Sequence, residues 1–247
     1  MIKYELNSKY DLKFRDYLFD IEIFFTQNDT TIHKARNELK VIKFGGISSI
    51  VKSFKVPNII NKIAYTYFRD SKAKKSYLYS LKIAEFTPSP IGYIEFFKNG
   101  LIDNSYFISE EFRYDFTIRE PLLDKSFKDR EEIFKAFARF TFELHNKEIF
   151  HNDYSPGNIL IKKDKTGYIF KIVDINRMKF TILNAEKRAE NFSKLWASED
   201  ELNIISDEYL KYYDCSIDFK SQVIYYSQKN KKIKNFKKRL KGKKIND

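Results

Sequence analysis

The sequence predicts an α+β protein of two lobes, in which an antiparallel sheet with one helix precedes a mainly helical part. Three observations predict this class. Short apolar runs separated by turn residues fill the first part of the chain. A long apolar stripe with helical spacing lies between residues 128 and 147. Two more strand-like runs follow that stripe directly. We expect the lobes to span residues 1–111 and 112–247.

Composition limits the class of protein. The chain has 247 residues, 43% of them hydrophobic and 17% aromatic, which is typical of a globular protein with a large core. One cysteine excludes internal disulfides and suits a reducing cytoplasm. The charged N-terminal stretch does not resemble a signal peptide, and no stretch approaches the ~20 apolar residues that cross a bilayer. We therefore expect a cytoplasmic protein.

The net charge of +12 has two interpretations. A basic surface can bind nucleic acid or anionic lipid. However, Lys, Ile, Asn, Tyr and Phe are all abundant while Gly and Pro are scarce, as an AT-rich genome would produce for any function. Because nothing besides charge indicates nucleic acid, we expect no nucleic-acid partner.

Two hairpins are predicted in the first lobe. The run IEIFF from Ile21 is strand-like, and the runs LKVIKF and ISSIVKSF are separated by the dipeptide Gly45-Gly46. The runs IGYIEFF and SYFISEEF are separated by a turn at Asn99-Gly100. Such dipeptides between apolar runs are typical of hairpin turns. A sheet of five strands is expected, and residues 1–20 are expected to form an extension or an edge element.

Two helices are predicted with defined buried faces. Residues 71–86 have apolar side chains at helical spacing, and the sequence TPSP ends this helix. Its expected buried residues are Ala73, Tyr77, Leu81 and Ala84. Residues 128–147 form an amphipathic helix. Its stripe is expected to be core and consists of Ile133, Phe134, Phe137, Phe140 and Leu144.

The segment His151 to Asn158, HNDYSPGN, carries the strongest chemical signal. It places His151, Asp153 and Asn158 in one loop between two apolar runs. Pro156 and Gly157 supply a turn that brings Asp153 and Asn158 to one side. A histidine and an aspartate at this spacing are common, but the following strand, turn, strand and Asp174 make the pattern much more specific. The competing interpretation is a polar surface loop whose side chains only satisfy the turn.

Phosphoryl transfer requires these residue types. It needs a carboxylate that accepts the proton of the acceptor hydroxyl, and cations that neutralise the phosphate oxygens. Asp153 is the candidate base, and Asn158 and Asp174 are the candidate Mg²⁺ ligands because Mg²⁺ prefers oxygen donors. We expect His151 to hold the loop by hydrogen bonds. The pattern therefore predicts a kinase-like phosphotransferase that uses ATP and Mg²⁺.

Four residues in or next to the first lobe are candidates for ATP binding. Lys52 lies in a predicted strand, where an amine can reach the α- and β-phosphates. The loop that covers the phosphates is expected near residues 31–37, which contain no glycine but include Arg36. Glu110 and Phe112 lie at the expected hinge, where backbone groups would bind the adenine.

The motifs HNDYSPGNILI and VDINRMKF resemble those of the WaaP-type lipopolysaccharide core kinases, the Kdo and heptose kinases. The segment SKAKKSYLYSLKIAEFTPSPIGYIEFF is similar to a helix and strand of that family. The resemblance covers roughly residues 20 to 180. It implies a protein-kinase-like fold, ATP as donor, and a sugar of the lipopolysaccharide core or a lipid A precursor as acceptor. It also implies work at the cytoplasmic face of the inner membrane.

Two departures from the family pattern are visible. Asn176 takes the place of the glycine in a DFG-type motif. Leu78 takes the place where the first-lobe helix offers a glutamate to the lysine, and Glu85 is expected on the same face about two turns away, ~10 Å. Alternative functions are an aminoglycoside- or choline-type kinase, or a pseudokinase that binds at the membrane.

The C-terminal segment has two possible roles. Ten of residues 229–244 are Lys or Arg. Ile233, Phe236 and Leu240 are spaced as one helical stripe, so the segment can lie on an anionic membrane surface. The alternative is a frayed, solvated end. The acceptor sugar, its hydroxyl and the oligomeric state do not follow from the sequence.

Overall fold

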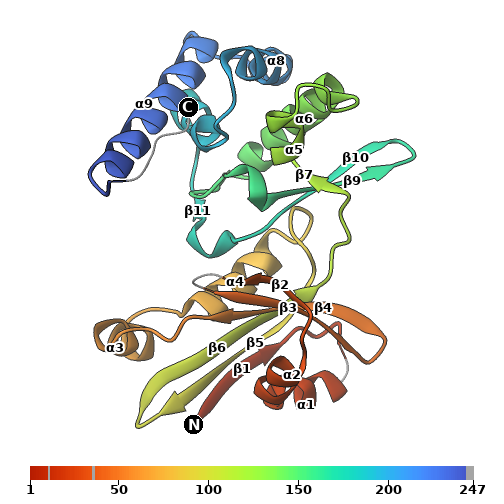
Figure 1. Cartoon of the computed structure of the whole chain (residues 1–247), viewed down its shortest axis with the longest axis vertical. Helices are drawn as coiled ribbons and strands as arrows, with labels where there is room; N and C mark the ends of the chain where they lie inside the picture. Colours follow the sequence, from red (N-terminus) through yellow and green to blue (C-terminus); the bar gives the residue numbers. More distant parts are fainter. Residues whose placement is uncertain (11, 35–36, 243–247) are drawn as a thin grey trace. The chain divides into compact units, whose positions relative to one another are not determined.

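The computed structural model describes residues 1–10, 12–34 and 37–242, with the backbone alone at residues 33 and 34. The chain divides into two compact units, Met1–Phe112 and Arg113–Asp247 (Figure 1). In sequence order, unit 1 contains β1 (Ile2–Leu6), α1 (Lys13–Phe19), α2 (Ile21–Gln27), β2 (Thr31–Lys34), β3 (Glu38–Phe44), β4 (Ile47–Phe54), α3 (Ile59–Tyr67), α4 (Lys72–Lys82), β5 (Pro90–Lys98) and β6 (Leu101–Glu110).

Unit 2 begins with short strands and a long helix and ends with three helices. Its elements are β7 (Phe116–Thr117), α5 (Arg119–Leu123), α6 (Arg130–Asn146), β8 (Ile149–Phe150), η1 (Pro156–Asn158), β9 (Ile159–Asp164), β10 (Gly167–Ile172), η2 (Ile175–Arg177), β11 (Lys179–Phe180), α7 (Ala185–Asn191), η3 (Phe192–Lys194), α8 (Glu199–Tyr209) and α9 (Phe219–Arg239). The α+β class with an antiparallel first sheet is confirmed.

The sheet of unit 1 is antiparallel and has the strand order β1-β5-β6-β4-β3-β2. Both predicted hairpins are present. Phe44 pairs with Ile47 around Gly45 and Gly46, whose φ angles are 56° and 82°. Asn99 and Gly100, with φ of 51° and 77°, join β5 to β6. Positive φ at both central residues gives the turn whose twist matches the strands, which is why these dipeptides determine the register.

Helices α1 and α2 cover one face of this sheet. The core on this face contains Tyr17, Leu18, Ile21 and Phe25 from the helices, together with inward residues of β3, β4, β5 and β6. The prediction of a strand from Ile21 was therefore wrong. Ile21 and Phe25 are four residues apart, so a helix places both on the sheet, whereas the run IEIFF by itself does not distinguish helix from strand. Residues 1–20 supply an edge strand and α1, so the described residues of unit 1 contain six strands and four α-helices rather than five and one.

Helix α4 lies on the opposite face and is shorter than predicted. It ends at Lys82, and Ser76 and Ser80 are buried with Ala73 and Tyr77. Leu81 and Ala84 are exposed, so their predicted burial was wrong. The helix packs against β5 and β6, and its buried face contains Ser76 and Ser80 rather than Leu81.

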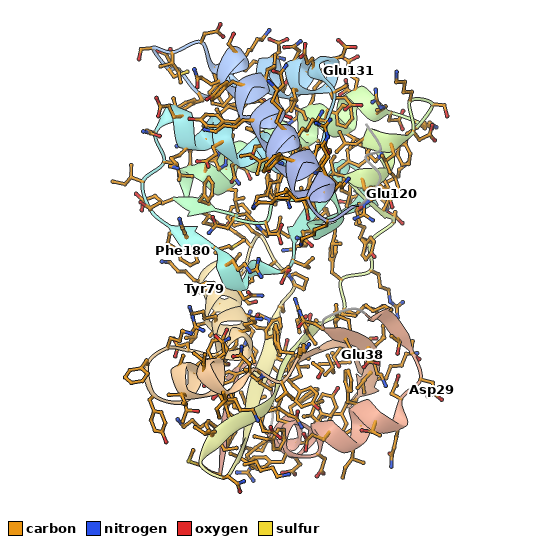
Figure 2. The ribbon with its side chains drawn as sticks, turned by 60° about the vertical axis from the view of Figure 1, so that its left-hand side comes forward. Asp29, Glu38, Tyr79, Glu120, Glu131 and Phe180 are labelled. Carbon is orange, nitrogen blue, oxygen red and sulfur yellow. The ribbon has the colours of Figure 1, made fainter. Side chains whose placement is uncertain are left out.

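Helix α6 confirms the predicted apolar stripe of the second part. Ile133, Phe134, Phe137 and Leu144 are buried, and Phe140 stacks on Phe170 of β10 with ring centroids 5.2 Å apart. The hairpin β9–β10 forms around the predicted turn, with Asp164 paired to Gly167. The short strand β11, which ends at Phe180 (labelled in Figure 2), pairs with β8. Among the described residues, no helix has the length and apolar content needed to cross a bilayer.

Candidate active site

The loop between β8 and β9 folds tightly around its own backbone. The carbonyl of Asp153 accepts hydrogen bonds from the Ser155 amide at 2.7 Å and from Nδ2 of Asn158 at 2.9 Å. The Asn158 amide donates to the Ser155 carbonyl at 2.9 Å. Because Nδ2 of Asn158 is turned to the loop, its Oδ1 is the atom left for another ligand. The turn at Pro156 and Gly157 thus brings Asp153 and Asn158 together, as the sequence predicted.

His151 connects this loop to the end of β10. Its ring is buried, with Nδ1 accepting from the Asp153 amide at 3.1 Å and Nε2 lying 3.0 Å from the Val173 carbonyl. These partners require the neutral tautomer with the proton on Nε2. Burial lowers the pKa of His151, although the carboxylates of Asp153 and Asp174 act in the opposite direction. A neutral histidine that fixes Asp153 and the residue before Asp174 suits a positioning role.

Asp174 reaches the same end of the hairpin as Asn158. Ile172 pairs with Ile159, and the Val173 amide donates to the Asn158 carbonyl at 3.0 Å. The backbone of Asp174 is left-handed, with φ of 57° and ψ of 45°, a conformation that aspartate tolerates better than most residues. Oδ1 of Asp174 accepts from Nδ2 of Asn176 at 2.9 Å. The asparagine in the place of a DFG glycine therefore orients the carboxylate.

Asn191, at the end of α7, holds the loop from the other side. Its Nδ2 donates to the His151 carbonyl at 3.0 Å, and its Oδ1 accepts from the His151 amide at 3.4 Å. The same Oδ1 lies 3.0 Å from Nε2 of His145 on α6. Sequence reasoning missed both Asn191 and His145. Asn191 is 40 residues from His151, and no local motif marks it.

Tyr154 fixes the loop to helix α6. Its ring is fully buried against Phe137, with centroids 5.6 Å apart, and its hydroxyl lies 2.8 Å from Oγ1 of Thr141. A Cβ at Gly157 would lie only 2.6 Å from a guanidinium nitrogen of Arg119. A larger residue at this position would therefore displace the guanidinium of Arg119, which packs directly against the loop. Arg119 is exposed and was not identified from the sequence.

Acid should destabilise this part of the chain through its buried histidines. Burial lowers the pKa of His145 from 6.5 to about 3. Below about pH 6.5 the unfolded chain binds a proton at His145 that the folded chain does not bind. The contribution of the neutral His145 to the free energy of unfolding is therefore complete above that pH and is lost as the pH falls toward 3. Between pH 7 and pH 5 we expect the contribution of His145 to the free energy of unfolding to fall by about 2 kcal/mol.

Urea unfolding at the two pH values measures this difference. The variant His145→Gln, which does not titrate, serves as the control and should show a smaller loss on acidification. Equal stability of the original chain at both pH values would show that His145 is protonated in the folded state.

Lys52 lies at the centre of the sheet of unit 1. It is on β4, opposite Leu39 of β3 and Phe107 of β6. Val51 belongs to the core under α1 and α2, so strand alternation turns Lys52 to the face that α4 covers. Nζ of Lys52 lies 5.3 Å from the ring centroid of Phe54 on that face.

The prediction that Glu85 lies on the same helix as Leu78 was wrong. Helix α4 ends at Lys82, and Glu85 lies in the turn that follows, so it is not two turns along a shared face with Leu78. Leu78 itself packs against the cluster of Phe54, Ala73, Tyr77 and Tyr93. The helix therefore presents an apolar side chain at the position where the family pattern has a glutamate.

The remaining nucleotide candidates belong to the end of β6. Oε1 of Glu110 accepts from the Tyr10 hydroxyl at 2.9 Å, so its side chain is engaged within unit 1. The amides of Glu110 and Glu111 donate to the carbonyls of Ser89 and Ser48, each at 2.8 Å. An adenine at Glu110 and Phe112 would have to use other backbone groups than these two amides. Arg36 lies outside the described residues.

A cavity of about 240 Å³ lies elsewhere in unit 1, between α3, the start of α4, the end of β4 and the first half of β6. Its lining includes Phe54, Pro57, Asn61, Tyr65 and Ser105. Lys52, Glu110 and Phe112, the residues expected to bind ATP that the structure describes, do not line it. We therefore do not assign this cavity to the nucleotide.

The residues at the hairpin fit a hard cation. Asp174 offers a carboxylate and Asn158 a neutral side-chain oxygen, the donor types that Mg²⁺ takes. In the part of the chain that the structure describes, no three His, Cys, Asp or Glu side chains are grouped to hold a metal. A cation here would therefore keep water and phosphate oxygens as most of its ligands, which is usual for Mg²⁺ in nucleotide sites.

Comparison with known proteins adds a structural neighbour. No protein-family model and no curated protein matches the sequence. Among solved structures, the chain is similar to WaaP in complex with acyl carrier protein, with a TM-score of 0.60, 13% identity, and 94% of this chain and 99% of that chain covered. A Rio2 kinase complex with ADP, Mg²⁺ and phosphoaspartate from Chaetomium thermophilum gives a TM-score of 0.46 at 14% identity, covering 92% of this chain and 72% of that one. This chain therefore has the fold found in WaaP, as its resemblance to the WaaP-type kinases led us to expect.

Proposed function

We propose that this protein is an ATP-dependent kinase that phosphorylates a sugar hydroxyl, of Kdo or heptose, in the inner core of lipopolysaccharide. One observation carries the kinase assignment. The β9–β10 hairpin and the buried His151 bring Asp153, Asn158 and Asp174 to one end of unit 2. These are the base and the two metal ligands that phosphoryl transfer requires.

Each residue has a defined part in the proposed reaction. The carboxylate of Asp153 accepts the proton of the acceptor hydroxyl while that oxygen bonds to the γ-phosphorus, and ADP leaves with the electrons of the broken bond. Asn158 and Asp174 hold Mg²⁺, which when bound neutralises charge on the phosphate oxygens. Lys52 binds the α- and β-phosphates, and His151 positions Asp153. Backbone groups near Glu110 and Phe112, with Arg36, complete the nucleotide site.

Cations beside the loop favour an anionic acceptor. Arg119 packs against Gly157, and the exposed Arg177 lies three residues after Asp174. Nζ of Lys194 donates to the carbonyl of Asn152, next to the proposed base. A Kdo carboxylate or the phosphates of a lipid A precursor would be attracted to this group of charges. Choline, a cation, would be repelled by it.

The basic C-terminal segment supports a place at the inner membrane. Helix α9 packs on unit 2 through Phe219 and Val223, and its later part exposes Ile233, Phe236 and Leu240 beside many lysines. The segment is helical as far as Arg239, so a frayed end does not describe it up to that residue. We infer that the protein works in the cytoplasm, on the inner face of the membrane that carries its acceptor.

The function is tested by mass spectrometry of lipopolysaccharide from cells with and without the gene. We expect the inner core to lack one phosphate when the gene is absent. An unchanged core, together with phosphate transfer to aminoglycosides by the purified protein, would favour the alternative small-molecule kinase. Unaltered core without any transfer would indicate a pseudokinase.

Replacing Lys52 with alanine should weaken ATP binding about tenfold or more, because an amine that pairs with phosphate contributes a charge-assisted contact. Isothermal titration calorimetry with ATP and Mg²⁺ measures the affinity. Lys43→Ala is the matched control, since Lys43 lies exposed on the neighbouring strand β3. Equal affinity of the Lys52 variant and the original chain would count against the assignment.

A further inference from the structure

Helix α3 presents its apolar side chains to solvent. Ile59, Ile60, Ile63, Tyr67 and the following Phe68 each keep between 43% and 82% of their surface exposed, and the helix has no buried residue. The four residues within the helix fall on one face, because they are spaced by one, three, four, seven and eight positions. The helix lies at an edge of unit 1, away from α1 and α2 (Figure 1).

The polar side of the same helix faces the protein. Oγ1 of Thr66 accepts from the Ile102 amide of β6 at 3.0 Å, and Lys62 forms an ion pair with Asp103. Asn58 caps the first turn, with its side chain accepting from the Asn61 amide at 3.0 Å. An ordinary surface helix packs its apolar face on the core and turns its polar face to water. Helix α3 is held in the reverse orientation by specific polar contacts, so its apolar face is not available to the core.

A basic border, formed by Lys55 before the helix and Arg69 after its end, flanks this apolar face. Residues 55–75 contain six Lys or Arg but one acidic residue, Asp70, which pairs with Lys74 at 2.8 Å. Lys55 precedes the helix and Arg69 follows it, and both are exposed. The aromatic rings of Tyr67 and Phe68 lie at the same end as Arg69. An apolar face with flanking cations and aromatic residues is the pattern of helices that lie in a membrane interface.

We propose that α3 binds an anionic lipid surface, with Ile59, Ile60, Ile63, Tyr67 and Phe68 inserted at the boundary between headgroups and acyl chains. The basic border would pair with lipid phosphates, each exposed cation adding to the attraction. A second copy of the chain is a poorer occupant, because two-fold pairing of this face would bring the two basic borders together. The proposal goes beyond phosphate transfer and does not depend on it.

Vesicle flotation tests the proposal with the full chain and the variant Ile60→Ser/Phe68→Ser. These changes remove apolar surface without altering charge or any contact that fixes α3. We expect the partition coefficient onto vesicles that contain phosphatidylglycerol to fall at least tenfold, about 1.4 kcal/mol. Leu123→Ser/Ile182→Ser, at similarly exposed positions of unit 2, is the matched control and should bind within twofold of the original chain.

Two further measurements separate lipid binding by α3 from lipid binding by α9. Each flotation is repeated in a background with Ile233→Ser and Phe236→Ser, which removes the apolar stripe of α9. A Phe68→Trp substitution, made with Trp196→Phe, should shift its fluorescence to shorter wavelength on anionic vesicles but not on phosphatidylcholine alone. The binding should weaken as salt is added.

Unchanged vesicle binding of the Ile60/Phe68 variant in both backgrounds would overturn the proposal. So would a dimer in lipid-free solution that the same variant dissociates, since this would identify a second copy as the occupant. ATP turnover of the variant in detergent solution is an independent reading. Turnover without vesicle binding would support the kinase function alone. Vesicle binding by a chain that does not transfer phosphate would support lipid binding by α3 alone.

Discussion

Replacing Asp153 with asparagine should lower the rate of phosphate transfer by about 10²- to 10⁴-fold, the usual contribution of a general base. The fold should persist, because the hydrogen bonds that hold this loop use the amide and the carbonyl of Asp153 rather than its carboxylate. The rate is measured as ADP release with a lipopolysaccharide acceptor. The melting temperature and the ATP affinity should stay close to those of the original chain.

Asp164→Asn supplies the matched control for this loss. Asp164 lies in the turn of the same hairpin, at the opposite end from Asn158 and Asp174. Its replacement should leave the rate within a factor of about two, since it takes no part in the proposed transfer. Full turnover by the Asp153 variant would exclude Asp153 as the base and would move the search to another carboxylate.

Of the substitutions proposed for this protein, Asn191→Ala should cause the largest loss of folding stability. The side chain of Asn191 forms hydrogen bonds with the amide and the carbonyl of His151 and with the ring of His145, and both histidines are buried. Its removal leaves these groups without their partners, which should lower the free energy of unfolding by about 3–5 kcal/mol. Urea unfolding at pH 7 measures the change.

Asn191→Asp distinguishes positioning from bulk packing. A carboxylate still accepts from the His151 amide and from His145 but does not donate to the His151 carbonyl, so this variant should lose less stability than the alanine variant. In the alanine variant, kcat should also fall by roughly 10²-fold because the loop that carries Asp153 is displaced. A normal kcat with reduced stability would show that Asn191 supports the fold but does not position the base.

The turns and the loop from His151 to Asn158 could be predicted because their causes are local. Gly45-Gly46 and Asn99-Gly100 adopt positive φ within a few residues of the strands they join. The loop from His151 to Asn158 forms hydrogen bonds to its own backbone at the Asp153 carbonyl. The spacing of these residues along the chain is therefore sufficient to predict the conformation of the loop. The expectation that His151 braces the loop agrees with its two hydrogen bonds.

The errors arose where several local structures satisfied the same pattern. The run from Ile21 suits a strand as well as a helix, and its position under the sheet selected the helix. In α4, Ser76 and Ser80 are buried in place of Leu81 on the face that meets β5 and β6. Apolar periodicity predicts a buried face only when the apolar side chains are the ones that touch the neighbour.

By itself, the sequence determined the α+β class, the hairpin registers, helix α6 and the loop that holds Asp153 and Asn158. Short-range backbone conformation and hydrogen bonding fix these features, so residues close in the chain are sufficient to specify them. Only the tertiary structure decided that Asn191 and His145 support the loop, that Leu78 is packed while Glu85 lies beyond the helix, and that α3 turns its apolar face outward. Those features depend on which distant surfaces meet, and burial of a side chain is a property of its neighbours rather than of its own segment.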